Sequence, residues 1–513
     1  MGCRYRSGDR LRRLALVWGT APAVPTSRGH RTTWRSVRVG LGQRIGDTLR
    51  LPGPGARRSV AVLAVFALAG AAGGAIALTS PALVQRLGLV EEVTELAPPV
   101  PQAALRPLAA DAPTPSTAGL RDVLDPAADE MPGQFAGVVI DPASGAQLWS
   151  HTPERALVPA STGKVLTAAA ALLTLNPTDR LDTRVVAGAE PGTVVLVGGG
   201  DPTLTALPEG EESLYPDAPR VSELADEVRA NVQGEIDTVL VDTSRYSGPQ
   251  LAEGWLPGDI AAGYITPIEP LMVDGGRVDP GLQDGPRVED PALGAGRALA
   301  EELGVDTVDE GTAPPGAVGL ASVSSAPVVE LVEHALRTSD NTLADMLAHE
   351  VSIARDDEGS FDGAARQVLA ALRQAGIDPA DAHLVDGSGM STLNKVPPQL
   401  LGAVLAAAAA PTENPLEPQF LRPILSGLPV AGGSGTLVNR YARDGDAALG
   451  RGVVRAKTGS LTGVSSLAGI VTDTDGRLLV FALMSNGANP GDVRPLHDEM
   501  AADLSRCGCS AAG

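Results

Sequence analysis

A serine hydroxyl and a lysine ammonium stand three residues apart at Ser161 and Lys164, just ahead of the apolar run 165–173 (VLTAAAALL). Residues three apart on a helix share one face, so we expect the two groups to be neighbours. The chain has 40 Lys and Arg residues but only three lysines. A buried lysine can give up its proton and act as a base, whereas an arginine cannot. The pair therefore favours a serine nucleophile with a lysine base, although this spacing alone could arise by chance.

Two further motifs follow in the chain. Ser339 and Asn341 form an S-x-N sequence, and residues 457–459 are K-T-G, followed by Ser460. The ordered set S-x-x-K, S-x-N, K-T-G is that of penicillin-binding proteins and serine β-lactamases. S-x-N alone is a weak signal and K-T-G is rare in this composition, so the ordered set carries the prediction.

The residue types suit proton transfer at a serine. Lys164 can take the Ser161 proton if a second positive charge, from Lys457, lowers the pKa of Lys164. Ser339 can relay a proton, and the Asn341 amide can hold both the base and a substrate amide. We therefore expect these five residues to meet in one cleft.

The remaining residues of the third motif suit substrate binding. Lys457 and Thr458 can receive a substrate carboxylate. The oxyanion that develops during acyl transfer needs two N–H donors. We expect one from the backbone of Ser161, at the start of a helix, and the other from Ser460, on a strand.

Periodicity predicts the elements that position these motifs. Strands are expected at 135–140 and 146–150 and, near the other end, at 452–456, 467–472 and 478–484, with helices between them. This pattern predicts a mixed α/β (α+β) fold in which both ends of the chain close one antiparallel sheet flanked by helices. Residues 181–325 are expected to form an inserted α+β region.

Several longer stretches support a family resemblance: 198–204 (GGGDPTL), 386–391 (DGSGMS), 433–437 (GSGTL) and 457–464 (KTGSLTGV). Together with the three motifs they resemble the D-alanyl-D-alanine carboxypeptidase/endopeptidases, which are low-molecular-mass class C penicillin-binding proteins. The resemblance covers roughly 120–505. It implies a penicillin-binding, serine β-lactamase-like transpeptidase domain at 119–180 and 326–506, interrupted by the insertion.

The resemblance also implies roles and partners. The enzyme would cleave peptidoglycan stem peptides ending in D-Ala-D-Ala, β-lactams would acylate it as covalent inhibitors, and no cofactor or metal would be needed. The implied catalytic residues are Ser161 as nucleophile, Lys164 as its base, Ser339 and Asn341, and the implied substrate-binding residues are Lys457, Thr458, Gly459 and Ser460.

The chain departs from this family at a few positions. Only 174 residues separate Lys164 from Ser339, which is shorter than in the fullest members, and Met390 stands where leucine is commoner. Lys395 lies just after the D-G-S-G turn, and we interpret it as a surface lysine.

The charge distribution separates the N-terminus from the rest of the chain. The net charge is −21, while residues 1–58 hold 13 arginines and two aspartates, or +11, which leaves −32 for the remainder. An acidic body argues against nucleic acid as a partner, because phosphate binding needs basic patches.

The uncharged segment 59–80 contains an apolar stretch, 60–78, long enough to cross a bilayer. The arginines before it place the tail 1–58 in the cytoplasm and the catalytic domain outside the membrane. A cleaved signal peptide is the alternative, with small residues at 75–77. Residues 81–118 are a Pro/Ala-rich linker. The tail 507–513 begins with Cys507 and holds Cys509, which could form a disulfide.

Two other functions remain open. A serine β-lactamase would also need fast deacylation, but no E-x-x-L-N type segment lies between the first two motifs. A non-catalytic β-lactam- or peptidoglycan-binding protein would not require Lys164 and Asn341. The sequence does not decide between carboxypeptidase and endopeptidase action.

Overall fold

The computed structural model describes residues 112–379, 381–411 and 419–507. The chain divides into two compact units, 1–104 and 105–513, and every described residue belongs to the second. The predicted tail 1–58, the predicted anchor 59–80, most of the predicted linker and Cys509 lie outside the described residues. Within the described part of the chain, no helix is long and apolar enough to span a bilayer.

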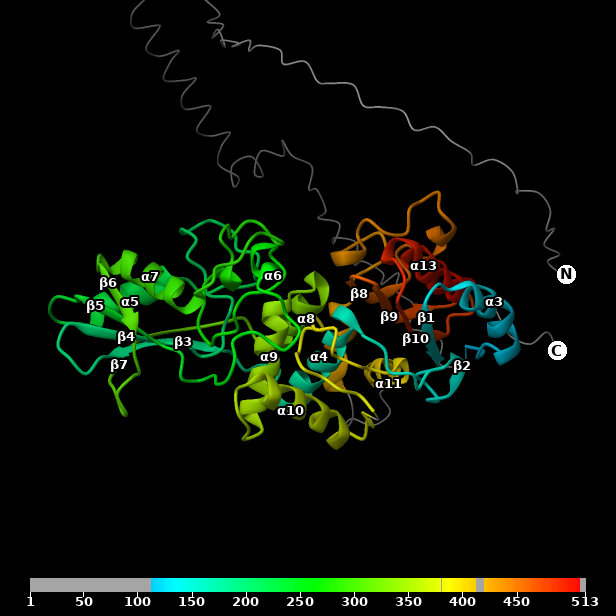
Figure 1. Ribbon diagram of the computed structural model, residues 1–513, viewed down its shortest axis with the longest axis horizontal. Helices are drawn as coiled ribbons and strands as arrows, with labels where there is room; N and C mark the ends of the chain where they lie inside the picture. The colour runs from blue at the N-terminus through cyan, green and yellow to red at the C-terminus, as the bar shows by residue number, and fades with distance from the viewer. Residues whose placement is uncertain (1–111, 380, 412–418, 508–513) are drawn as a thin grey trace, which may run out of the picture. The chain divides into compact units, whose positions relative to one another are not determined.

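The first sheet joins the two ends of the described chain (Figure 1). Its five antiparallel strands run in the order β2-β1-β10-β9-β8, and Gln134 of β1 lies opposite Asn486 of β10. The prediction of one sheet closed by both chain ends is therefore confirmed. The strands are β1 (Gln134–Ile140), β2 (Gln147–His151), β8 (Arg455–Leu461), β9 (Val464–Thr472) and β10 (Leu478–Asn486).

The expected strand at 452–456 was placed too early. Gly452 has a φ of 75° in the turn before the sheet, and β8 begins at Arg455 and runs through the K-T-G motif. The polar K-T-G sequence lacks the apolar alternation of a typical strand, so periodicity alone did not reveal it.

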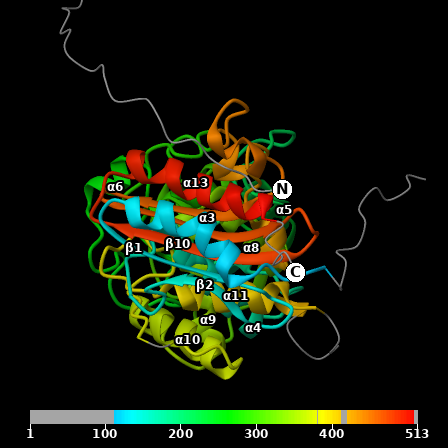
Figure 2. The same ribbon diagram turned by 90° about the vertical axis from the view of Figure 1, so that its right-hand side faces the viewer.

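Helices cover both faces of this sheet (Figure 2). One apolar core lies between the sheet and α3 (Thr117–Glu130) with α13 (Pro490–Arg506). A larger core lies on the other face, where α11 packs on the strands and the remaining helices pack around α4. These helices are α4 (Lys164–Thr174), α8 (Val328–Thr338), α9 (Asn341–Ala354), α10 (Phe361–Gln374), α11 (Pro398–Ala409) and α12 (Pro423–Gly427).

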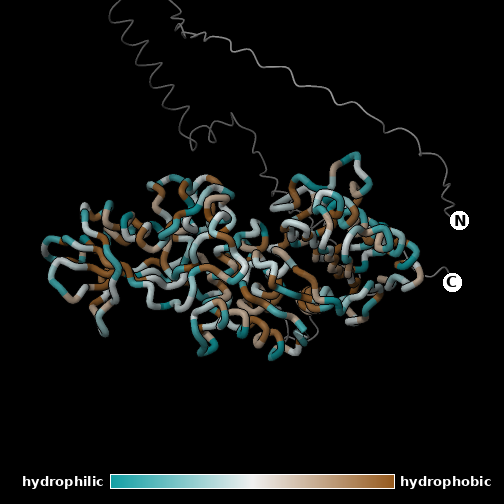
Figure 3. Tube along the Cα trace, in the orientation of Figure 1, coloured by the Kyte–Doolittle hydropathy of each residue, from teal (hydrophilic) through white to brown (hydrophobic). Residues whose placement is uncertain are grey.

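The helix α4 is the centre of the larger core. Its sequence, KVLTAAAALLT, is buried from Lys164 through Leu172, and α8, α9, α10 and α11 all contact it. A helix that is apolar all round is stable only when it is surrounded in this way. Apolar stretches of the chain run through the interior in Figure 3, and polar loops lie mainly outside. Because α4 is packed on all sides, the residues at its start have a rigid support.

A second sheet occupies the middle of the sequence, with the order β6-β5-β4-β3-β7. Strands β4, β5 and β6 are parallel, and β3 is antiparallel to its two neighbours. Helices α5 (Val221–Asn231) and α7 (Pro291–Leu303) pack on it, and α6 (Gly258–Ala261) lies in a long loop region. The strands are β3 (Asp182–Ala187), β4 (Thr193–Val197), β5 (Thr238–Asp242), β6 (Thr307–Glu310) and β7 (Gly319–Ser324).

All five of these strands fall within 181–325, the range expected for the insertion, although the domain boundaries themselves stay a prediction. Strands β6 and β7 were not predicted, because β6 is short and largely exposed and β7 has little apolar character. Short 3-10 helices complete the described chain: η1 (Ala160–Gly163), η2 (Asp274–Gly276), η3 (Gln419–Leu421), η4 (Gly435–Leu437) and η5 (Asp446–Gly450).

Candidate active site

Lys164 is buried beside Ser161 at the junction of η1 and α4. Its ammonium donates to three oxygens: Ser161 Oγ at 3.1 Å, Asn341 Oδ1 at 2.5 Å and the Ser388 carbonyl at 2.7 Å. Lys164 is only 1% exposed, whereas Ser161 is partly exposed. The structure thus brings the first motif and Asn341 of the second motif together, with the Ser161 hydroxyl on the accessible side.

The surroundings of Lys164 favour its neutral form. Burial lowers the pKa of Lys164 to about 8, against the opposing charges of Asp345, Asp386 and Asp340. Burial also lowers the pKa of Lys457 well below its usual range, with a further contribution from the nearby Lys164 charge. Desolvation disfavours an ammonium, and a second ammonium nearby disfavours it further. The prediction that the Lys457 charge lowers the pKa of Lys164 is wrong, because burial is the cause that lowers it and the charge effect acts from Lys164 on Lys457. With a pKa of about 8, Lys164 is unprotonated in a minor fraction of molecules at neutral pH, and this fraction, which can act as the base, grows as the pH rises.

The second motif lies where α8 ends and α9 begins. Ser339 has a φ of 65° and is the C-cap of α8, while Asp340 is the N-cap of α9 and accepts from the Leu343 N–H at 2.9 Å. The Asn341 amide nitrogen donates to the Tyr264 carbonyl at 2.8 Å, which leaves its oxygen facing Lys164. This orientation of the amide is fixed by hydrogen bonds on both sides.

Lys457, on β8, connects the third motif to the second. It is fully buried, and its ammonium donates to Ser339 Oγ at 2.8 Å and to the Thr458 carbonyl at 3.0 Å. The Thr458 hydroxyl shares a hydrogen bond of 2.7 Å with the hydroxyl of Thr436, which is exposed. The exposed Ser460 accepts from Arg494 Nε at 3.2 Å through its hydroxyl.

Two glycines let the walls of the site approach one another. A Cβ on Gly459 would lie 2.1 Å from Ser466 Oγ and 2.6 Å from the Pro159 carbonyl. A Cβ on Gly389, whose φ is +82°, would lie 2.0 Å from the Ala160 carbonyl. No side chain fits at either distance, so the K-T-G strand and the D-G-S-G turn both need glycine to pack against the backbone that carries Ser161.

The sequence interpretation gave no role to the 386–391 turn, although it singled this turn out as a signature. The turn presents the Ser388 carbonyl to Lys164, and Asp386 holds its shape by accepting from the Gly389 and Ser391 N–H groups at 2.7 and 2.6 Å. The Trp255 indole, from the middle of the sequence, donates to the same carboxylate at 2.8 Å. No local pattern around Trp255 could have predicted this contact.

Lys395 is exposed, and its ammonium lies 3.5 Å from the Thr392 carbonyl, as expected of a surface lysine. Met390 is half-buried and packs against an apolar cluster that includes Trp255.

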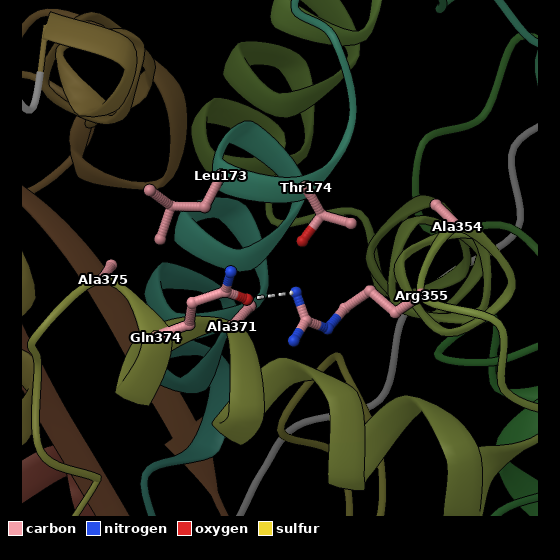
Figure 4. A pocket seen from close by; sticks show the side chains of 7 residues that line it. All are labelled: Leu173, Thr174, Ala354, Arg355, Ala371, Gln374 and Ala375. Carbon is pink, nitrogen blue, oxygen red and sulfur yellow. Dashed lines mark hydrogen bonds between the residues drawn. The ribbon is translucent and has the colours of Figure 1, made fainter. Parts of the chain in front are cut away.

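Two cavities lie outside the contacts described above. One, of about 470 Å³, lies at the far end of α4, where Figure 4 shows Arg355 bonded to Gln374. The other, of about 840 Å³, lies between the β8–β9 turn and the start of α13, next to Ser460 in sequence, and includes Arg494. Neither is lined by the first two motifs.

The chain is similar to known proteins over most of its described length. A family model described as D-Ala-D-Ala carboxypeptidase 3 (S13) matches residues 119–286 and 282–506. The chain is 45% identical over 434 residues to carboxypeptidase DacB of Mycolicibacterium smegmatis, covering 83% of this chain and 93% of the relative. It is 30% identical over 490 residues to the D-alanyl-D-alanine carboxypeptidase of an Actinomadura species, covering 78% and 87% respectively.

The fold has a counterpart among solved structures. Penicillin-binding protein 4 of Haemophilus influenzae superposes with a TM-score of 0.62 at 21% identity, covering 75% of this chain and 99% of that one. At this identity the likeness concerns the fold.

Proposed function

Because this chain belongs to the D-Ala-D-Ala carboxypeptidase 3 (S13) family, we propose that it removes the terminal D-alanine of peptidoglycan stem peptides through an acyl-enzyme on Ser161. The observation that carries the proposal is the 3.1 Å contact between Lys164 Nζ and Ser161 Oγ, with burial lowering the pKa of Lys164 to about 8. A serine hydroxyl becomes a nucleophile only when such a base is in reach.

Acylation begins when Lys164 takes the Ser161 proton and Oγ attacks the carbonyl carbon of the penultimate D-alanine. The C–N bond of the tetrahedral intermediate then breaks, and the leaving D-alanine amine must receive a proton. Ser339, whose hydroxyl is held by Lys457, can relay to this amine the proton that Lys164 took from Ser161, which returns Lys164 to its neutral form. Asn341 holds Lys164 in place through its amide oxygen while the proton moves.

The third motif would receive the terminal carboxylate of the substrate. Burial lowers the pKa of Lys457, and the negative charge of the bound carboxylate would raise it again, so that Lys457 binds the substrate as an ammonium. The Thr458 hydroxyl, already paired with the exposed Thr436, faces the accessible side. The backbone N–H groups of Ser161 and Ser460 form the oxyanion hole, aimed at the carbonyl oxygen that gains charge. Gly459 keeps this strand close enough to Ser161 for both donors to serve one oxygen.

Hydrolysis of the acyl-enzyme completes the cycle, with water attacking the ester and the Ser161 oxygen recovering its proton. A β-lactam enters the same path, because opening of its ring also acylates serine, but its leaving group stays attached and hinders deacylation. β-Lactams are therefore covalent inhibitors in this proposal.

The substrate lies outside the cytoplasmic membrane, so the catalytic domain must also lie there. Cys507 is disulfide-bonded, a state that oxidising compartments favour. We propose that the segment 60–78 serves as the membrane anchor, with the Pro-rich residues after it as a spacer.

Mass spectrometry of muropeptides tests the proposal. The full chain should convert a pentapeptide substrate to the tetrapeptide with release of D-alanine, and Ser161→Ala should not. A cross-linked dimer in a parallel reaction measures endopeptidase action. Sustained nitrocefin turnover without D-alanine release would instead indicate a β-lactamase, and binding without any turnover would indicate a non-catalytic protein.

A further inference from the structure

A buried ion pair ties the S-x-N motif to the middle of the sequence. Arg277 Nη2 donates to Asp340 Oδ2 at 3.0 Å, and the two side chains are 1% and 0% exposed. The Tyr215 hydroxyl donates to the same carboxylate oxygen at 3.0 Å. The other oxygen, Oδ1, accepts from the Leu343 N–H and caps α9. Asp340 thus joins the start of α9 to two residues from the segment 181–325.

Arg277 itself is held firmly. Its Nη1 donates to the Tyr215 hydroxyl and to the Asp274 carbonyl, both at 2.9 Å, and its Nε donates to the Gln283 carbonyl at 3.3 Å. The guanidinium also stacks over the Tyr215 ring, 5.1 Å from its centroid. A guanidinium with this many fixed partners has a defined direction, which a more flexible ammonium would not share.

The position of Asp340 makes this pair relevant to catalysis. Its neighbours in the chain are Ser339, which contacts Lys457, and Asn341, which contacts Lys164. The backbone through all three residues turns sharply from one helix into the next. A shift of the Asp340 carboxylate would therefore move Ser339 and Asn341, which are hydrogen-bond partners of the two lysines.

The pair also affects the charge near the base. The Asp340 carboxylate raises the pKa of Lys164, and Arg277 and Arg287 hold the pKa of Asp340 well below its ordinary value, so Asp340 is ionised. A cation beside this carboxylate offsets its field at Lys164. Other charged or titratable groups act in the same region: Asp345 of α9, Asp386 of the 386–391 turn, Lys457 of β8 and His334 of α8.

We propose that Arg277 is a positioning residue for acylation, which fixes Asp340 so that Ser339 and Asn341 meet the two lysines and which balances the Asp340 charge near Lys164. The inference rests on the proposed function of Ser161 and Lys164. It makes the middle segment of the sequence part of the catalytic apparatus, although none of its side chains needs to touch the substrate for this purpose.

The test measures the rate at which a fluorescent penicillin acylates Ser161 in the full chain, from pH 5 to pH 10. Arg277→Gln removes the cation that is paired with Asp340 and leaves only the charge of Arg287 nearby, so the rising limb should move up by about one pH unit and acylation at pH 7 should slow about tenfold. Asp340→Asn keeps an N-cap for α9 but removes the negative charge that raises the pKa of Lys164, so the rising limb should move to lower pH. The double variant should return close to the wild-type position.

Arg477→Gln is the matched control, because Arg477 forms a similar buried pair with Asp141 outside the three motifs. It should lose thermal stability without moving the pH profile. If Arg277→Gln does not fold, Asp340→Asn and Arg277→Lys decide the matter, since the lysine keeps the charge and should retain the position of the wild-type limb, while the loss of the fixed guanidinium contacts should lower the plateau rate. If the pH profiles of the wild type and Arg277→Gln coincide, or if Arg277→Gln and Asp340→Asn shift the limb in the same direction, this inference is wrong but the proposed function is not affected. A wild-type chain that is never labelled at Ser161 would overturn the proposed function as well.

Discussion

The Lys457 ammonium lies 2.8 Å from Ser339 Oγ and joins two motifs that are 118 residues apart in the chain. Lys457 is fully buried, and its ammonium also donates to the Thr458 carbonyl. Since Lys164 contacts Ser161 and Asn341 in the same way, each lysine links two elements of the site. We propose different tasks for the two residues, with Lys164 as the base for Ser161 and Lys457 as the residue that holds Ser339 and binds the substrate carboxylate.

Ser339→Ala should slow acylation by about 10²-fold, because it removes the hydroxyl that can pass a proton to the leaving amine. The measurement is the second-order rate of labelling by a fluorescent penicillin. Thr338→Ala is the control, since the Thr338 hydroxyl donates to the His334 carbonyl of its own helix and lies next to Ser339 in the chain. Equal effects of the two substitutions would exclude a role for the Ser339 hydroxyl.

The acylation rate of the wild-type chain should rise with pH along a limb centred near pH 8. Burial lowers the pKa of Lys164 to about 8, and only the neutral amine can take the Ser161 proton. Below that pH the lysine is protonated and the rate should fall about tenfold per pH unit. Stopped-flow measurement of acylation across pH 5–10 checks this expectation, and a rate that does not vary with pH would contradict it.

Lys164→Arg should reduce acylation by about 10²–10⁴-fold while preserving the positive charge, since arginine does not serve as the base. Thermal unfolding separates this effect from misfolding. Lys395→Arg is the matched control, because Lys395 is exposed and lies outside the contacts of the site. Normal labelling of the Lys164 variant would place the base elsewhere.

Which residues come together could be predicted because they belong to short motifs with characteristic spacing. Ser161, Lys164, Ser339, Asn341 and Lys457 are each within a recognisable spacing, and the structure brings all five together. The sheet closed by both chain ends was also predictable, because its central strands are short, nearly continuous apolar runs bounded by turn residues. The strand that contains K-T-G was predicted to begin too early in the chain, because its polar residues do not show the apolar period of a strand.

Gly389→Ala should destabilise the protein by about 3 kcal/mol or more, because the new Cβ would meet the Ala160 carbonyl and the residue has a positive φ. The displaced turn should also move the Ser388 carbonyl away from Lys164 and slow acylation. Gly376→Ala separates the two causes: φ is +79° there, but nothing lies within 4 Å, so about 1 kcal/mol is expected. Urea unfolding measures the free energy of unfolding of both variants, and equal losses of stability would refute the steric argument.

Asp201→Asn should stabilise the protein above pH 7 and have little effect near pH 4. Burial raises the pKa of Asp201 to about 7, and its Oδ2 has no hydrogen-bond partner among the described residues, while Oδ1 accepts from the N–H and hydroxyl of Thr203. A raised carboxyl pKa means that stability falls as pH rises from about 4 to about 7. The amide keeps the Oδ1 bonds without this loss, on the order of 2–4 kcal/mol. Thermal melts at pH 4 and 8 test this, and a gain at both pH values would contradict it.

The supports of the motifs could not be predicted from the sequence. Arg277, Tyr215 and Trp255 lie far along the chain from the motif or turn that they support, and each reaches it through one long-range hydrogen bond or ion pair. Such contacts depend on the three-dimensional path of the chain and leave no periodicity or fixed spacing. The same holds for the Ser388 carbonyl, since a backbone oxygen has no signature of its own in a sequence.

Peptide mass mapping of the penicillin adduct tests the central claim most directly, because it asks which atom of the chain is acylated. The full chain is treated with benzylpenicillin at pH 8, digested and mapped by tandem mass spectrometry. A single penicilloyl group on Ser161, absent from Ser161→Ala, is the result expected when Lys164 activates this hydroxyl. An adduct on another residue, or an undiminished adduct in Ser161→Ala, would contradict the account.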